Sequence, residues 1–258
     1  MPSEFQLRKD IVLAGKRLYA KSLIVGTEGN ISARTARAKI IATPKNVNKG
    51  FLDTESLAIV DLETGKSLSK AQPSSEIKMH LHVYRSRPEA NAVVHAHPPV
   101  ATGFSVAGID LAQCILPELI LTVGPVPLTR YGTPSTEEVP KAILPHIHKS
   151  NAFLLANHGA LTLGKSIDEA TDKMEMVEQF ARVLLVARAL GNVNVLPKEE
   201  VSRLIELRKL NGQEIPPSIC ESCNYCEKTP VGKGKDKPLM KDEELLKLVT
   251  STVREMMK

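Results

Sequence analysis

Tryptophan is absent from this sequence of 258 residues, and aromatic residues make up only 3% of it. Proteins that bind single-stranded nucleic acid stack the bases on aromatic side chains, so this scarcity argues against such a surface. Long apolar runs are also missing. No stretch approaches the roughly 20 residues that span a bilayer, and the opening MPSEFQLRKD has no apolar signal core. The sequence therefore predicts a cytoplasmic protein that does not bind membranes.

Positive charge is concentrated in one short segment. The formal net charge is +5, and residues 228–241 (KTPVGKGKDKPLMK) hold five Lys and one Asp, so they carry +4 of it. The rest of the chain carries only +1. A nearly neutral body lacks the basic face that nucleic acid requires, and we expect no nucleic-acid partner.

The hydrophobic and charged fractions, 42% and 24%, are those of an ordinary globular protein. Periodicity, caps and Pro or Gly breaks predict the following elements: helices over residues 4–21, 75–87, 138–149, 166–190 and 198–210, and strands over 39–43, 57–62, 91–97 and, as a pair around Gly159, 152–163. Helices alternate with short strands, which predicts an α/β domain over residues 1–195 followed by a C-terminal extension over 196–258.

The extension contains two features of its own. Cys220, Cys223 and Cys226 form C-x2-C-x2-C, which in a chain without a secretory signal favours a second metal site over disulfides. The alternative is three solvent-facing thiols. The last 17 residues, DEELLKLVTSTVREMMK, carry an apolar stripe at helical spacing and predict an amphipathic helix with a docking face.

A separate set of residues predicts a metal site. His95 and His97 lie two apart on a predicted strand, so their side chains leave the same face of it. Glu76 opens a predicted helix, and His158 precedes Gly159, which permits close backbone packing. Three imidazoles and one carboxylate are a plausible tetrahedral set for Zn²⁺, although spacing alone does not show that they converge.

Five motifs in order resemble the class II aldolase/adducin superfamily, and within it the L-fuculose-1-phosphate aldolases. They are GTEGNISAR (26–34), ATP (42–44), QPSSE (72–76), YRSRPEANAVVHAH (84–97) and NHGAL (157–161). The resemblance covers roughly residues 7–191. It implies an α/β/α sandwich around a mostly antiparallel sheet, assembled as a homotetramer with active sites between subunits.

The resemblance also implies residue roles. A catalytic zinc ion, one per subunit, would be held by His95, His97 and His158, with Glu76 as fourth ligand and as the acid/base. The residues implied to bind the substrate phosphate are Gly29, Asn30, Lys45, Asn46, Ser74 and Ser75. The expected reaction cleaves a ketose 1-phosphate, such as L-fuculose 1-phosphate, to dihydroxyacetone phosphate and an aldehyde through a metal-stabilised enediolate.

The chain departs from the family pattern in two places. The phosphate loop usually reads T-P-S-G or T-P-T-G, whereas Lys45 and Asn46 occupy its last two positions here. The tyrosines that L-fuculose-1-phosphate aldolases contribute from a neighbouring subunit also have no clear counterpart. Alternatives on the same fold are a sugar-phosphate 4-epimerase, which typically has Asp at the position of Glu76, a 3-oxo-tetronate 4-phosphate decarboxylase and a methylthioribulose-phosphate dehydratase. An adducin-like interaction module without catalysis is the alternative of another class.

The predicted terminal helix adds a candidate partner. A terminal amphipathic helix behind a flexible linker resembles the peptides that load enzymes into bacterial microcompartments, so the shell of such a compartment is one expected partner. The other interpretation is that this helix packs on its own tetramer.

Overall fold

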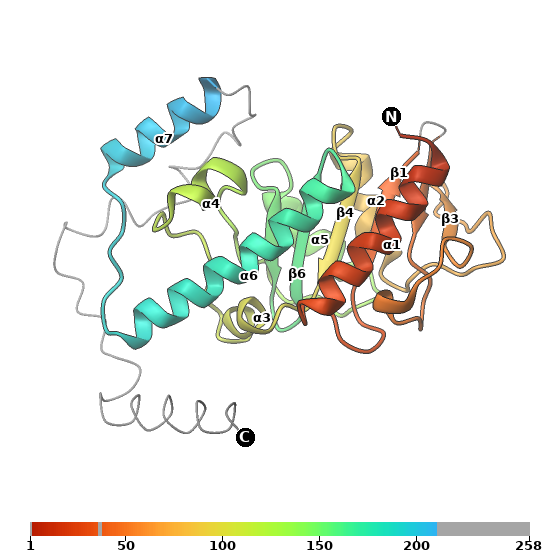
Figure 1. The fold of residues 1–258 in the computed structure, drawn as a ribbon, viewed down its shortest axis with the longest axis horizontal. Coiled ribbons are helices and arrows are strands. Elements are labelled where there is room, and N and C mark those ends of the chain that lie inside the picture. The colour runs from red at the N-terminus through yellow and green to blue at the C-terminus, as the bar shows by residue number, and fades with distance from the viewer. Residues whose placement is uncertain (1, 36–37, 211–258) are drawn as a thin grey trace.

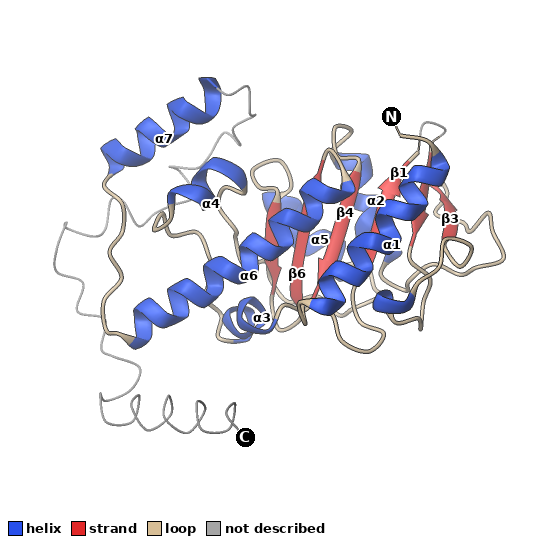
Figure 2. Cartoon of the chain, in the orientation of Figure 1, coloured by secondary structure: helices blue, strands red, loops and turns tan. Residues whose placement is uncertain are grey.

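One six-stranded sheet organises the protein (Figures 1 and 2). The computed structural model describes residues 2–35 and 38–210. The strands are hydrogen-bonded in the order β3-β2-β1-β4-β6-β5, and every neighbouring pair is antiparallel. Their bounds are β1 (Asn30–Arg34), β2 (Lys39–Ala42), β3 (Ala58–Asp61), β4 (Ala92–Ala96), β5 (Ala152–Leu155) and β6 (Gly159–Gly164).

Helices connect the strands and cover both faces of the sheet. Their bounds are α1 (Glu4–Ala20), α2 (Ile77–Ser86), α3 (Pro99–Val106), α4 (Pro117–Thr122), α5 (Glu138–Ile143), α6 (Ile167–Ala189) and α7 (Lys198–Leu210), with 3-10 turns η1 (Lys49–Phe51) and η2 (Leu144–His146). Both long helices begin as predicted, because the hydroxyls of Ser3 and Ser166 accept hydrogen bonds from the free amides of Gln6 and Glu169. None of the described helices is long and apolar enough to cross a membrane.

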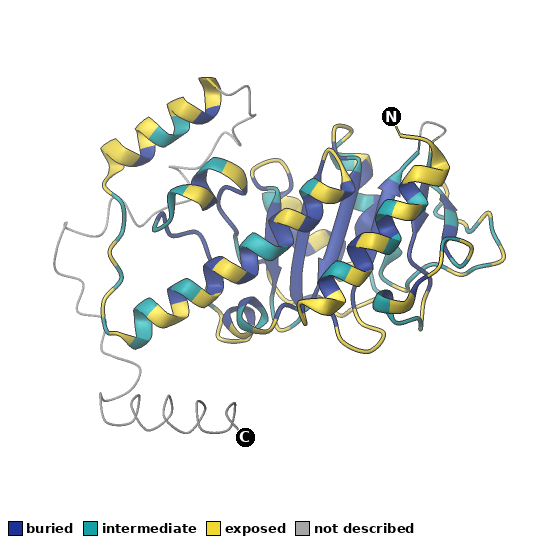
Figure 3. Cartoon of the chain, in the orientation of Figure 1, coloured by how far each residue is buried: buried dark blue, intermediate teal, exposed yellow. Residues whose placement is uncertain are grey.

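The strands of the sheet are largely buried (Figure 3), and the sheet lies between two apolar layers. One layer packs the sheet against α1, α3 and α6 and includes Ile31, Val94 and Met174. The other packs it against α2 and α5 and includes Val93 and Leu161. Adjacent residues of β4 point into opposite layers, as strand geometry requires. The predicted α/β/α sandwich with a mostly antiparallel sheet is therefore confirmed.

The face that carries α2 also carries polar residues at one end of the two central strands. Asn30 of β1 lies directly opposite His95 of β4, and Ser32 lies opposite Val93. Because side chains alternate along a strand, Asn30, Ser32 and His95 all face α2. The first turn of α2 and the ends of these strands therefore enclose one polar region.

Helix α7 packs on α4 rather than on the sheet. Val201 is fully buried with Cys114 and Ile120, and the Arg208 guanidinium donates a hydrogen bond of 2.8 Å to the carbonyl of Ile120. The boundary predicted at residue 195 falls between α6 and α7 and stays a prediction. Cys220, Cys223, Cys226 and the predicted terminal helix lie outside the described residues.

Candidate metal centre

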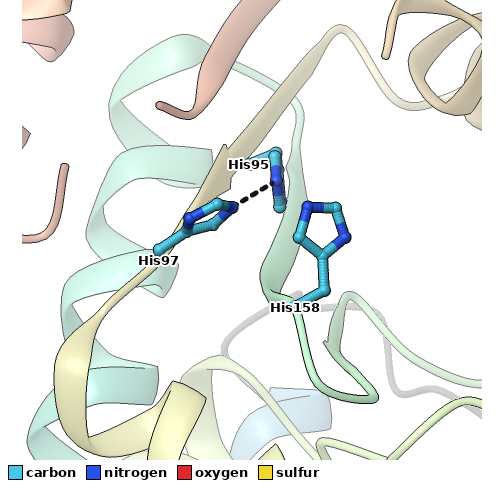
Figure 4. Close-up of side chains that lie close together, drawn as sticks. All are labelled: His95, His97 and His158. Atoms are coloured by element: carbon cyan, nitrogen blue, oxygen red, sulfur yellow. Dashed lines mark hydrogen bonds between the residues drawn. The ribbon is translucent and has the colours of Figure 1, made fainter. Parts of the chain in front are cut away.

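The three predicted ligand histidines come together at one end of the sheet (Figure 4). His95 lies on β4, His97 follows the end of that strand, and His158 occupies the turn between β5 and β6. Because β6 pairs with β4, with Ala160 opposite Ala96, this turn lies beside the end of β4. The ring centroids are 4.7 to 5.0 Å apart, and one ligand atom from each histidine lies within 4.8 Å of the others.

Gly159 makes this approach possible. A Cβ atom at this position would lie 2.5 Å from the carbonyl oxygen of Ala96 and 2.6 Å from Cδ2 of His97. Both distances are well below van der Waals contact, so a side chain here would separate β6 from β4 beside two of the histidines. The glycine of the NHGAL motif therefore has a steric role in the site.

The contacts at Nδ1 of His95 and of His97 determine which ring nitrogen of each histidine carries the proton. His95 Nδ1 is 2.9 Å from the carbonyl oxygen of Ala160, and His97 Nδ1 is 3.2 Å from the carboxylate of Glu28. Both partners accept hydrogen bonds, so each histidine carries its proton on Nδ1 and leaves Nε2 as a lone pair.

These two Nε2 lone pairs face each other at 3.1 Å. Two acceptor nitrogens at this distance repel unless a cation lies between them. Ligand nitrogens of tetrahedral zinc, with bonds of about 2.0–2.1 Å, are about 3.3–3.4 Å apart. Histidine ligands of metals typically donate the N–H of their other ring nitrogen to a carbonyl or carboxylate, as Nδ1 of His95 and of His97 do here. The donor set therefore fits a divalent metal ion.

The Glu76 carboxylate lies beside two of the three histidines. It lies at the N-terminal end of α2, with Oε2 3.4 Å from His95 Nε2 and Oε1 3.2 Å from His158 Nε2. Glu76 Oε1 and His158 Nδ1 are buried without a hydrogen-bond partner among the described residues. Buried polar atoms are rarely left unpaired, and for Oε1 a metal beside the carboxylate would supply the missing interaction.

Burial and charge together set the ionisation of these groups. Burial raises the pKa of Glu76, but His95, His158 and a hydrogen bond from Asn30 outweigh it, so the pKa of this carboxyl lies below its usual value. Burial lowers the pKa of His95 to about 3, and burial and then the neighbouring His158 also lower the pKa of His97. An anionic carboxylate beside neutral imidazoles is the state that a metal binds.

Four of the six residues predicted to bind phosphate, Lys45, Asn46, Ser74 and Ser75, lie on two adjacent loops. Lys45 donates its amide to the carbonyl of Gln72, and Ser74 donates its amide to the carbonyl of Thr43. These bonds hold residues 43–46 beside residues 72–75. Asn46 has φ 58°, a left-handed conformation that Gly and Asn adopt most readily, which explains how Asn replaces the usual Gly.

Gly29 and Asn30 lie at the start of β1, beside His95. Gly29 has φ 68°, and a Cβ there would lie 2.8 Å from the carbonyl oxygen of His95. The amide nitrogen of Asn30 donates to Glu76 Oε2 at 2.8 Å and to Ser74 Oγ at 3.2 Å. The Asn30 side chain therefore connects the Glu76 carboxylate with Ser74, a residue predicted to bind phosphate, and does not point to solvent.

Sequence reasoning missed several residues around this centre. His80 and Ser32 lie behind Asn30, and Glu28 lies behind His97. Lys49 is 1% exposed, its ammonium donates to the carbonyl of Thr27, and burial lowers its pKa to about 8. The sequence held a signal for His80, because it follows Glu76 by four residues and so shares its helix face.

An α/β/α sandwich with three converging histidines and an adjoining carboxylate defines a class of metal-dependent enzymes. Residues 9–185 match the family described as the Class II Aldolase and Adducin N-terminal domain, and the chain belongs to this family. The family predicted from the five motifs is thus confirmed.

Three similar proteins indicate the type of reaction that this family member catalyses. The chain is 33% identical over 210 residues to a 3-oxo-tetronate 4-phosphate decarboxylase of Pectobacterium atrosepticum, covering 79% of this chain and 94% of the relative. It is 35% identical over 166 residues to an L-fuculose phosphate aldolase of Methanococcus maripaludis, covering 64% and 89%. The solved structure of an L-fuculose 1-phosphate aldolase superposes with a TM-score of 0.75 at 28% identity, covering 81% and 98%. The chain is therefore a metal-dependent enzyme of the lyase type.

Proposed function

We propose that this enzyme cleaves a ketose 1-phosphate such as L-fuculose 1-phosphate to dihydroxyacetone phosphate and an aldehyde. The observation that carries this proposal is the position of Glu76, whose two carboxylate oxygens lie 3.4 and 3.2 Å from the Nε2 atoms of His95 and His158. A carboxylate beside the histidines that would hold a metal would also lie beside the substrate carbon next to the carbonyl group bound there. Glu76 is the proposed acid/base, and the proposed ligands are Glu76, His95, His97 and His158.

The reaction is an exchange of one carbon–carbon bond for one carbon–hydrogen bond. The Glu76 carboxylate takes the proton that the C4 hydroxyl loses, the C3–C4 bond breaks, and its electron pair moves onto C3 and the C2 carbonyl. Glu76 then delivers this proton to C3, which gives dihydroxyacetone phosphate, while C4 leaves as the carbonyl carbon of the aldehyde. The divalent metal, when bound, supplies positive charge that stabilises the substrate oxygens as negative charge develops on them.

The proposed phosphate site lies on the other side of Glu76. Ser74 and Ser75 precede α2, and Lys45 and Asn46 lie on the adjacent exposed loop. Hydroxyls before the N-terminus of a helix, together with an ammonium group, suit a phosphate dianion. Gly29 and Asn30 would border this phosphate, Gly29 through its backbone.

A second candidate is 3-oxo-tetronate 4-phosphate decarboxylation, which the 33% identity to the Pectobacterium enzyme favours. Loss of CO2 from that substrate leaves an electron pair on the carbon next to the carbonyl, and protonation there also yields dihydroxyacetone phosphate. The two candidates thus share the protonation step and differ only in the group that leaves. Glu76 has the same role in both.

The shared step provides the first experiment. Zinc-loaded protein incubated with dihydroxyacetone phosphate in D2O should exchange one C3 hydrogen for deuterium, as measured by proton NMR. Chelation should stop the exchange, zinc should restore it, and Glu76→Gln should slow it about 10²- to 10⁴-fold. Absence of exchange in zinc-loaded protein would refute both candidates and favour the epimerase, the dehydratase or the non-catalytic module.

Full substrates then separate the two candidates. Release of dihydroxyacetone phosphate with an aldehyde from L-fuculose 1-phosphate supports the aldolase. Release of the same product with CO2 from a 3-oxo-tetronate 4-phosphate supports the decarboxylase instead. The ratio of kcat/KM for the two substrates decides between them.

The remaining assignments are also proposals. Three imidazole nitrogens and a carboxylate favour zinc, which elemental analysis would identify. A homotetramer with shared active sites is tested by light scattering.

Docking of the terminal helix on a microcompartment shell is tested by deleting residues 240–258. Loss of the tetramer contradicts this docking, whereas loss of shell binding alone supports it. Changing Cys220, Cys223 and Cys226 to Ser should lower the metal content by one equivalent if they bind metal.

A further inference from the structure

A continuous chain of buried hydrogen bonds runs from α2 to the Glu76 carboxylate. The Tyr84 hydroxyl is 2.8 Å from Ser32 Oγ, which is 2.7 Å from His80 Nδ1. His80 Nε2 is 2.5 Å from Asn30 Oδ1, and Asn30 Nδ2 is 2.8 Å from Glu76 Oε2. Tyr84, Ser32, His80 and Asn30 are each no more than 3% exposed.

The partners determine the direction of every bond in this chain. Asn30 turns its amide nitrogen to Glu76 and its amide oxygen to His80, and an amide oxygen only accepts. His80 Nε2 must therefore carry a proton. Burial lowers the pKa of His80 to about 4, so the ring is neutral and its Nδ1 has none. Nδ1 then accepts from Ser32, whose oxygen accepts from Tyr84.

The reverse orientation of Asn30 is unfavourable at both ends. Its amide oxygen would then face the acceptor oxygen of Glu76, and its amide nitrogen would face the Nε2–H of His80. Two acceptors and two donors would be opposed in a region without solvent. The proton on His80 thus selects one of two amide orientations that have nearly the same shape.

We propose that His80 is a positioning residue, which acts through Asn30 to hold the Glu76 carboxylate beside the three histidines. Asn30 Nδ2 also reaches Ser74 Oγ at 3.2 Å, so the same orientation places the hydroxyl of a residue predicted to bind phosphate. His80 itself forms hydrogen bonds with Ser32 and Asn30, and forms none with Glu76 or with the predicted ligand histidines. The role at Glu76 rests on the proposed function, whereas the selection of the amide orientation does not.

The first test examines the wild-type protein directly. Nitrogen-15 NMR of the metal-free protein with labelled histidine reports which ring nitrogen of His80 carries the proton. We expect a protonated Nε2 and an unprotonated Nδ1. The opposite tautomer would overturn the proposal whether or not the protein is active.

Variants test the consequence for the site. His80→Leu removes the donor to Asn30 at similar volume, and His80→Gln restores a donor at nearly the position of Nε2. His82→Leu is the matched control, because His82 lies on the same helix, is half-buried and forms no hydrogen bond with Asn30. The readouts are zinc affinity by competition with a chelator and kcat for deuterium exchange into dihydroxyacetone phosphate.

A residue behind a metal ligand typically changes metal affinity or activity by about 10- to 100-fold. His80→Leu should show a loss of that size in zinc affinity or in kcat, His80→Gln should recover most of it, and His82→Leu should show none. A His80→Leu protein with wild-type affinity and kcat, or a His80→Gln protein as impaired as His80→Leu, would overturn the proposal. Absence of exchange in the wild type would instead refute the proposed function, and zinc affinity would still test His80.

Discussion

Acid should destabilise the metal-free protein partly through His80, and the size of this effect follows from its burial. The folded pKa of His80 is about 4, whereas an unfolded histidine has a pKa of about 6.5. Between these values the unfolded chain binds a proton that the folded protein excludes, so stability falls as the pH decreases from about 6.5 towards 4. At pH values above 6.5 both states are unprotonated, and His80 contributes no pH dependence.

Linkage gives the magnitude. One proton bound only by the unfolded state costs about 1.4 kcal/mol per pH unit, so lowering the pH from 7 to 5 removes about 2 kcal/mol through His80. His80→Gln cannot titrate at this position. The variant should therefore lose about 2 kcal/mol less than the wild type over the same interval, while the contributions of His95 and His97 remain in both proteins.

The assay is urea unfolding of chelated wild-type and His80→Gln protein at pH 7 and pH 5, in parallel with thermal unfolding. The difference corresponds to about 4–8 °C in Tm for a protein of this size. His82→Gln serves as the control, because its half-buried ring should produce a smaller difference. Equal losses in the wild type and His80→Gln would refute the assignment of a buried, neutral His80.

Three further outcomes are expected. Gly159→Ala should weaken zinc affinity at least about 10-fold and cost about 1–3 kcal/mol of stability, because the added Cβ would overlap the end of β4. Gly103→Ala is the control: a Cβ there has no neighbouring atom within 4 Å, so this variant should be neutral or stabilising. Zinc at about 1,000 times its Kd should raise the Tm of chelated protein by about 8–16 °C, and His95→Ala should abolish this response in a thermal shift assay. Val201→Ala should lower the stability of the whole body by about 1–2.5 kcal/mol in urea unfolding, since Val201 is fully buried between α7 and α4; an unchanged midpoint would indicate that α7 unfolds separately.

Local signals in the sequence were sufficient for the long helices. Ser3 and Ser166 cap α1 and α6 through contacts within three residues, and the glycine that ends α6, Gly191, has φ 87°. Strand β1 was missed because Gly26 and Gly29 interrupt the segment before it and its apolar alternation is limited to Ile31 and Ala33, which are buried in one layer of the core. The alternating residues Asn30 and Ser32 are polar, and hydrogen bonds with α2 bury them.

The metal centre was only partly predictable. A spacing of two predicted that His95 and His97 leave one face of a strand; the structure ends β4 at Ala96, so His97 lies just beyond the strand, and the two side chains still come together. His158 is more than 60 residues away in the sequence, and its approach depends on the pairing of β6 with β4. No local pattern specifies that pairing, so the sequence offered His158 as a candidate and only the resemblance to a known family implied that it joins the other two. The short helices α3 and α4 were also missed, because each begins at a proline and is too short to show a helical period, and α3 contains Gly103.

The interior position of β1, β4 and β6 in the sheet determines how firmly the three histidines are held. Strands in the interior of a sheet open only in the largest unfolding events, whereas edge strands such as β3 open more readily. His95 lies on one of these strands, and His97 and His158 flank β4 and β6. The backbone that carries these side chains therefore stays in place while an ion leaves and returns. The slowest amide hydrogens of β4 should accordingly stay protected from exchange after chelation.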